Sequence, residues 1–116
     1  MLSKMRQYTS ESQTARLIEL GFEKPKSRIV KQRFDRSTSS WITIGEKGDY
    51  SIGELIEMLM AIKAVRLCID NEYDHRSLIV KRLLDGKWDI LYGNVGQELV
   101  DLLFDAILKL KEEGVI

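Results

Sequence analysis

The chain has 116 residues, of which 44% are hydrophobic and 31% are charged. Its 18 basic and 18 acidic residues give a formal net charge of zero, and it contains one Cys, one His and one Pro. This composition predicts one soluble globular domain over residues 1–116 and excludes disorder, an intrachain disulfide and a transmembrane span. No signal peptide is visible, so a cytoplasmic location is expected.

The charges are distributed unevenly along the chain. Residues 1–36 contain nine basic and four acidic residues, which gives this part a net charge of +5. Residues 37–116 contain nine basic and fourteen acidic residues, which gives −5. Such a chain can attract a polyanion with its N-terminal part or pair head to tail with a second copy. The same charges also serve simply to keep the surface soluble.

The first predicted helix begins near Ser10 and ends before Gly21. Ser10 and Gln13 have the spacing of a capping box, in which each side chain accepts a hydrogen bond from the other residue's backbone N–H. Gly21 is suited to end the helix, because glycine readily adopts the left-handed conformation that a helix C-terminus requires.

Two strands are predicted next, over residues 28–36 and 41–44, with a turn over 45–48. The first of them lies in the most basic stretch of the chain. Phe34 and Trp41 add aromatic rings, which stack on unpaired bases, while basic side chains neutralise phosphates. Candidate nucleic-acid contacts are therefore Lys24, Lys26, Arg28, Lys31, Arg33, Arg36 and Trp41. A solvated edge strand explains the same charges without any ligand.

The second predicted helix has the clearest capping signal. Ser51 and Glu54 form another capping box, and apolar residues then recur at helical spacing as far as Ile62. The alternating segment 65–69 reads as a third strand.

A hairpin is predicted around Asp85-Gly86, between β-rich runs at 78–84 and 87–92. This dipeptide favours a type I′ turn, which needs positive φ at both central residues. Trp88, Ile90 and Tyr92 are then expected to share one face of the sheet.

The last helix is expected to start at Asn94 and run to about Glu113, with Gly114 ending it. Its apolar residues span an arc of about 240°, whereas a surface helix needs only about 100°. Such a helix is packed on two sides within the domain or shares one side with another chain. The candidate self-association residues are Val100, Phe104 and Leu108, which are expected to be partly exposed in a single copy of the chain.

The element order is thus α-β-β-α-β-β-β-α. Hairpin-spaced strands with helices between the groups predict an α+β domain. We expect three helices and a mostly antiparallel sheet of four to five strands.

The sequence predicts no catalytic residue, metal ligand or cofactor. Cys68 and His75 are too few for a nucleophilic triad or a zinc site. The segment Asp70–Asp74 resembles the opening of a calcium loop, but His75 and Lys81 occupy the positions that need Gly and Glu. The sequence leaves undecided whether this acidic loop binds a cation adventitiously.

Three stretches of the chain are similar to known sequences. They are 14–22 (TARLIELGF), 50–56 (YSIGELI), and 88–92 with 98–101 and the ending 111–116 (KEEGVI). They resemble small uncharacterised proteins of prophages and conjugative elements in Bacteroides-type gut bacteria. The resemblance implies an accessory protein of a mobile genetic element and no activity.

Taken together, these patterns predict a non-enzymatic accessory or interaction protein. Its expected partner is another protein or a second copy of itself, with no role at a membrane. The alternative is a nucleic-acid-binding accessory protein that uses the basic 24–36 segment.

Overall fold

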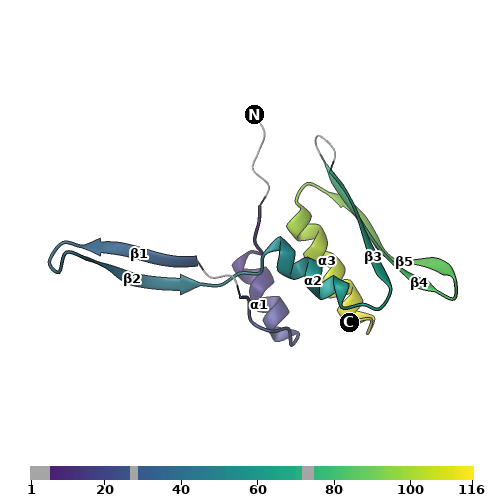
Figure 1. Cartoon of the computed structure of the whole chain (residues 1–116), viewed down its shortest axis with the longest axis horizontal. Helices are drawn as coiled ribbons and strands as arrows, with labels where there is room; N and C mark the ends of the chain where they lie inside the picture. Colours follow the sequence, from purple (N-terminus) through teal and green to yellow (C-terminus); the bar gives the residue numbers. More distant parts are fainter. Residues whose placement is uncertain (1–5, 27–28, 72–74) are drawn as a thin grey trace.

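The computed structural model describes residues 6–26, 29–71 and 75–116. Its elements are α1 (Glu11–Glu19), β1 (Ile29–Asp35), β2 (Ser40–Lys47), α2 (Ile52–Met60), β3 (Val65–Asn71), β4 (Arg76–Leu84), β5 (Lys87–Gly96) and α3 (Leu99–Glu112). The predicted α+β class and element order are confirmed. The strands form two antiparallel sheets, β1-β2 and β3-β4-β5. In Figure 1 these two sheets lie at opposite ends of the molecule, with the three helices between them.

Both predicted capping boxes are present. The Ser10 hydroxyl accepts a hydrogen bond from the Gln13 N–H at 3.2 Å, and the Ser51 hydroxyl accepts one from the Glu54 N–H at 3.1 Å. Gly21 has a φ of +97° just after α1, as a helix-ending glycine should. The second helix ends at Met60, two residues before its predicted end.

The wide apolar arc of α3 is explained within the chain. This helix packs against β4 and β5 on one side and against α2 on another. Val100 and Leu103 are both fully buried. The expectation that Val100 is partly exposed in a single copy is therefore wrong, because the chain's own elements cover it. Phe104 and Leu108 are half-buried, so self-association through them stays a prediction.

The hairpin at Asp85-Gly86 is confirmed, with φ of +52° and +77° at the two turn residues. The expectation that Trp88, Ile90 and Tyr92 share a face is wrong. A bulge shifts the register, so that Val80 pairs with Tyr92 while Lys81 pairs with Ile90. The extra residue reverses the alternation. Tyr92 therefore faces the helices, and Trp88 and Ile90 face the other way.

Two boundaries differ from those predicted because strand pairing extends beyond the local signals. The expected turn at 45–48 is largely strand, since β2 continues to Lys47, opposite Ile29. Asn94 does not cap α3. It lies in β5 opposite Leu78, and the helix begins at Leu99. Backbone hydrogen bonds to the neighbouring strand override the local preference at both places.

Candidate functional site

A two-stranded ribbon projects from the rest of the molecule, and we call residues 29–47 the arm. It consists of β1, the turn 36–39 and β2. Within the described residues, neither strand makes extensive contact with another element. Figure 1 shows the arm extending from the helices along the 67 Å long axis of the molecule. An isolated two-stranded hairpin is at best marginally stable in water, so the arm is poorly supported by its own chain.

The end of the arm carries an exposed aromatic pair. Phe34 and Trp41 are directly opposed across the two strands, and their rings meet edge to face with centroids 5.5 Å apart. Phe34 is 46% exposed and Trp41 is 65% exposed. An edge-to-face pair stabilises a hairpin by about 0.5–1.5 kcal/mol beyond its buried area. The pair therefore supports the arm and still leaves much apolar surface in water.

The turn of the arm is held by Asp35. Its Oδ1 atom accepts hydrogen bonds from the Ser37 hydroxyl at 2.8 Å and from the Ser37 N–H at 3.1 Å. These bonds, with a weaker one from the Thr38 hydroxyl, hold the pKa of the Asp35 carboxyl below its usual value. Ser39 completes the turn with a φ of +53°, a conformation that costs a non-glycine residue energy.

The predicted nucleic-acid contacts are only partly brought together. Lys24 and Lys26 are exposed in the segment that leads to the arm, and Arg28 lies outside the described residues. The remaining predicted contacts belong to the arm itself: Lys31 in β1, Arg33 in β1, Arg36 in the turn and Trp41 in β2.

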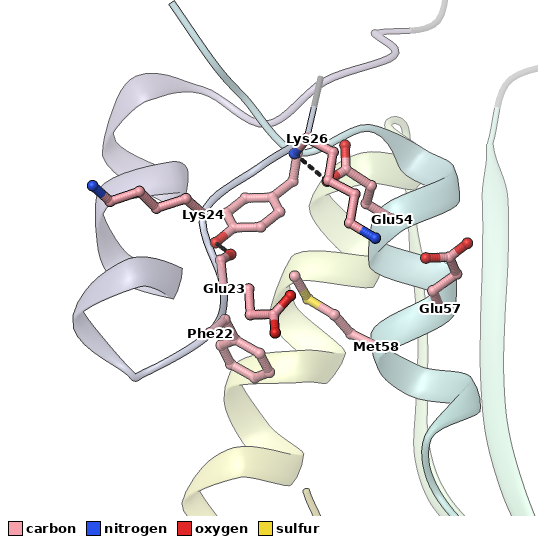
Figure 2. A pocket seen from close by; sticks show the side chains of 8 residues that line it. Phe22, Glu23, Lys24, Lys26, Glu54, Glu57 and Met58 are labelled. Carbon is pink, nitrogen blue, oxygen red and sulfur yellow. Dashed lines mark hydrogen bonds between the residues drawn. The ribbon is translucent and has the colours of Figure 1, made fainter. Parts of the chain in front are cut away.

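Two hydrogen bonds hold the segment that leads into the arm, one from Tyr50, just before α2, and one to Glu54 in α2. The Tyr50 hydroxyl donates to the backbone carbonyl of Glu23, and the Lys26 N–H donates to Glu54 Oε2 at 3.0 Å. The bond between Lys26 and Glu54 can be followed in Figure 2, beside a cavity whose volume is about 240 Å³. Burial raises the pKa of the Tyr50 hydroxyl above its usual value, and the carboxylates of Glu54 and Glu23 raise it further. The polar groups of this cavity thus position the arm.

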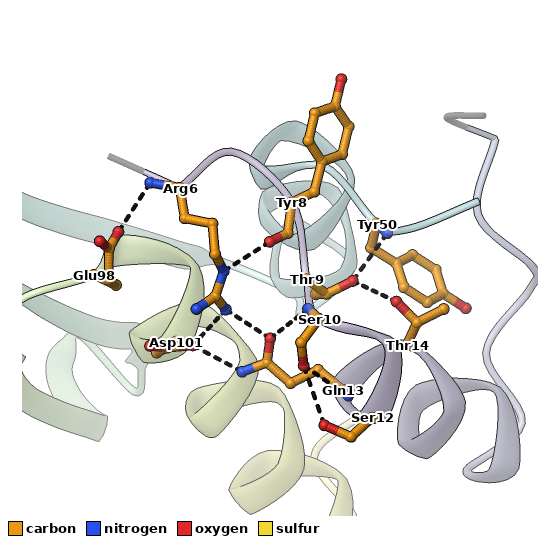
Figure 3. A network of polar contacts seen from close by, with 10 residues as sticks. All are labelled: Arg6, Tyr8, Thr9, Ser10, Ser12, Gln13, Thr14, Tyr50, Glu98 and Asp101. Carbon is orange, nitrogen blue, oxygen red and sulfur yellow. Dashed lines mark hydrogen bonds and ion pairs between the residues drawn. The ribbon is translucent and has the colours of Figure 1, made fainter. Parts of the chain in front are cut away.

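The other end of the arm is fixed by buried polar groups, which Figure 3 shows in part. The Thr9 N–H donates to the Tyr50 carbonyl at 2.9 Å, and the Tyr50 N–H donates to the Thr9 hydroxyl at 3.0 Å. The Thr14 hydroxyl donates to Asp49 Oδ1 at 2.7 Å. Thr9, Thr14 and Asp49 are all buried, and satisfied buried polar groups specify one arrangement. The chain leaving β2 therefore has a defined direction.

The segment before α1 connects that helix to α3. The Arg6 guanidinium donates to Asp101 Oδ1 at 2.6 Å and to Gln13 Oε1 at 2.8 Å, and Gln13 Nε2 donates to Asp101 Oδ1 at 2.8 Å (Figure 3). Gln13 and Asp101 border a polar groove that also includes Phe104 and Asp105. The exposed part of Phe104 therefore lies among carboxylates, which is an unfavourable setting for an apolar interface.

A second exposed surface was not predicted from the sequence. We call it the open face: the side of the β3-β4-β5 sheet that points away from the helices. Strand register places five exposed apolar side chains on it, namely Ile79, Leu83, Trp88, Ile90 and Val95. Arg66 and Lys81 lie over the Trp88 ring at 5.7 and 5.1 Å from its centroid. The signal that could have revealed this face is the uninterrupted run 78–80, which is typical of a strand with two apolar faces.

Residues considered for catalysis or metal binding are scattered. Cys68 lies mid-strand in β3, opposite Ile79, and His75 comes just before β4. Residues 72–74 of the acidic loop lie outside the described residues. Within the described ranges, no three His, Cys, Asp or Glu side chains gather as metal ligands would. Over the same ranges, no helix combines the length and apolarity needed to cross a bilayer.

Comparisons with known proteins found no match to any protein family, curated protein or solved structure.

Proposed function

We propose that this chain is a non-enzymatic interaction protein that binds its partner with the arm. The observation that carries the proposal is the exposure of Phe34 and Trp41 on a ribbon that no helix contacts extensively within the described residues. Aromatic side chains are enriched where proteins bind partners, because they bury much area for little conformational entropy. A partner that covers this pair also supplies the packing that an isolated hairpin lacks.

The rigid base of the arm supports the same role. Hydrogen bonds from Tyr50 and to Glu54 and Asp49 hold the chain before and after the arm, which limits the directions in which the ribbon can project. A preoriented element loses less entropy on binding than a free loop. The place of this protein among accessory components of a mobile element is part of the proposal and is supported by the sequence resemblance described above.

Site-specific photocrosslinking tests the arm as the contact element. A benzoylphenylalanine placed at Phe34 or at Trp41 is expected to yield the same crosslinked partner in the native cell. The matched control is the same label at Lys63, an exposed position after α2. Equal labelling at Lys63, or no adduct from either arm position, contradicts the proposal.

Nucleic acid is the second candidate partner of the arm. A two-stranded β-ribbon fits the major groove of B-form DNA. Arg33 and Arg36 are both exposed on the ribbon, close in sequence to the Phe34–Trp41 pair. The neighbouring acid, Asp35, is engaged with the turn hydroxyls. Basic and aromatic groups on one arm are the combination that phosphates and bases require.

Salt-dependent binding distinguishes this second candidate. If the arm binds DNA or RNA, affinity should fall steeply with salt, because each neutralised phosphate releases counterions. Reversing charge at Lys31 and Arg33 should weaken binding and reduce the salt slope, whereas Lys63→Glu should change both much less. An electrophoretic shift assay that shows no complex at low salt and high micromolar protein removes the nucleic-acid candidate.

A further inference from the structure

We propose that the open face binds an acidic amphipathic helix of a partner protein, which forms a third layer over β3, β4 and β5. The inference rests on the proposed binding role of the chain, on a surface separate from the arm. It is carried by the juxtaposition of five exposed apolar side chains with two cations on one side of the sheet.

The pattern of β4 is that of a strand covered on both sides. Leu78 and Val80 point toward the helices and are fully buried. Ile79 lies between them on the open face and is exposed, as is Leu83 further along. A sheet face with this apolar content normally packs against another element. Figure 1 shows α2 and α3 on one side of the sheet and no ribbon on the other.

Charge on the open face identifies the chemistry of the missing layer. Arg66 and Lys81 are direct cross-strand partners, and both lie over the ring of Trp88. Like charges opposed across two strands are destabilising, and an aromatic ring offsets this only in part. Asp70 lies on the same face, opposite Ser77, but no ion pair joins it or another acid to either cation within the described residues. Carboxylates of a partner, placed beside its apolar stripe, would neutralise the pair.

The same charges argue against a second copy and against nucleic acid. A two-fold axis that buries Trp88 against its own copy would bring the Arg66–Lys81 pairs of both copies together. Nucleic acid would need a more basic and more aromatic surface, whereas four of the five exposed apolar side chains here are aliphatic: Ile79, Leu83, Ile90 and Val95.

The dimensions of the open face match one helix. Strands lie about 4.8 Å apart, so three strands offer a width of about 10 Å. An α-helix with its side chains is about 10–12 Å across. The stretch of β5 from Trp88 to Val95 is about 25 Å long at about 3.3 Å per residue. A helix of about 16 residues spans that length.

Peptide selection on the full chain tests the inference. A phage library of random 16-residue peptides is panned against the wild-type protein and against Arg66→Glu/Lys81→Glu. The expected winners carry Glu or Asp beside apolar residues at i, i+3, i+4 and i+7. The best peptide, made synthetically, should bind the double variant at least about tenfold more weakly. The matched control Lys63→Glu/Lys109→Glu makes the same charge change elsewhere and should bind as wild type does.

Fluorescence shows whether the peptide covers the open face. In Trp41→Phe, Trp88 is the only tryptophan of the chain, and its emission should shift to shorter wavelength when the peptide binds. Ile90→Glu provides a second disruptive variant if the double variant does not fold, because Ile90 is 66% exposed and its replacement removes little packing. Binding should be lost in Ile90→Glu as well.

Four outcomes overturn the inference. The first two are a selection that enriches no peptide, and enriched peptides that bind the wild-type protein and the double variant equally. The other two are nucleic-acid binding that the double variant abolishes, and a homodimer that Trp88→Glu dissociates. Failure of the proposed function of the arm is distinguishable from failure of this inference about the open face. Trp41→Ala on the arm should leave peptide binding intact, and a failed selection leaves the arm crosslinks unaffected.

Discussion

The β4–β5 hairpin packs one face on α3, whereas the β1–β2 hairpin makes no extensive contact with a helix in the described part of the chain. Both are antiparallel, both contain a bulge, and both end in a short turn. They differ in how far their side chains are buried by other elements. In β4–β5 the buried side chains include Leu78, Val80 and Tyr92, while the aromatic pair of the arm stays exposed.

This difference indicates how much each turn must contribute to the stability of its hairpin. The packed hairpin obtains most of its stability from buried apolar area, so its Asp85-Gly86 turn needs mainly to set the register. In the described part of the chain the arm has no extensive contact of this kind, so it depends on local features: the Phe34–Trp41 pair and the hydrogen bonds of Asp35. Changes in the packed part should therefore affect global unfolding, and changes in the arm should stay local.

The largest effect is expected from a substitution in α3, the helix that packs on the β4–β5 hairpin. Leu103→Glu places a carboxylate among fully buried side chains and should destabilise the protein by more than about 4 kcal/mol, enough to unfold it. The control is Phe104→Glu on the next, half-buried position, which should remain folded. Circular dichroism during thermal unfolding measures both. A cooperative transition near the wild-type temperature in Leu103→Glu contradicts the packing described for α3.

The second effect acts on the turn of the packed hairpin. Gly86 has a φ of +77°, which a β-branched residue resists, so Gly86→Val should cost about 1–3 kcal/mol in global stability. Lys87→Val introduces the same side chain one residue later, in the strand, and should cost much less. Chemical denaturation compares the two. Equal stability of both variants would count against the type I′ turn.

A smaller effect of opposite sign is expected in the arm. Ser39 has a φ of +53°, so Ser39→Gly should relieve strain and stabilise the arm locally by about 1 kcal/mol. Ser37→Gly is the control, since it removes the hydroxyl bonded to Asp35 and should loosen the turn. Hydrogen exchange of the arm amides should slow in the first variant and quicken in the second. A shift of the global unfolding midpoint in either would show that the arm is coupled to the helices.

The smallest effect is a pH dependence confined to the end of the arm. Hydrogen bonds from Ser37 lower the pKa of Asp35, so its stabilising contribution is present above the usual Asp pKa of about 3.9. That contribution is lost as the pH falls through the lowered pKa. The amide NMR signals of Ser37 and Thr38 should therefore move as the pH falls below 4. A titration of Asp35 at or above its ordinary value would refute the turn geometry.

Much of the local structure was predictable because its signals are short-range. Capping boxes at Ser10 and Ser51 and the Asp85-Gly86 turn each depend on residues within four positions of one another. The candidate site was predictable only in composition. Basic residues and Trp41 mark the arm in the sequence, but their projection from the helices depends on anchors such as Tyr50, which bonds to a residue 27 positions away.

By itself, the sequence determined the order of the elements, the helix caps and the hairpin turn, because hydrogen bonds between near neighbours and the conformational freedom of glycine act locally. Only the tertiary structure decided which surfaces are covered. Packing of α2 and α3 on one side of β3-β4-β5 buries Val100 within its own chain, and the extra residue at Leu91 turns Trp88 and Ile90 away from the helices. The same arrangement leaves Phe34 and Trp41 of the arm exposed. Burial depends on contacts between residues far apart in the chain, and no local pattern specifies them.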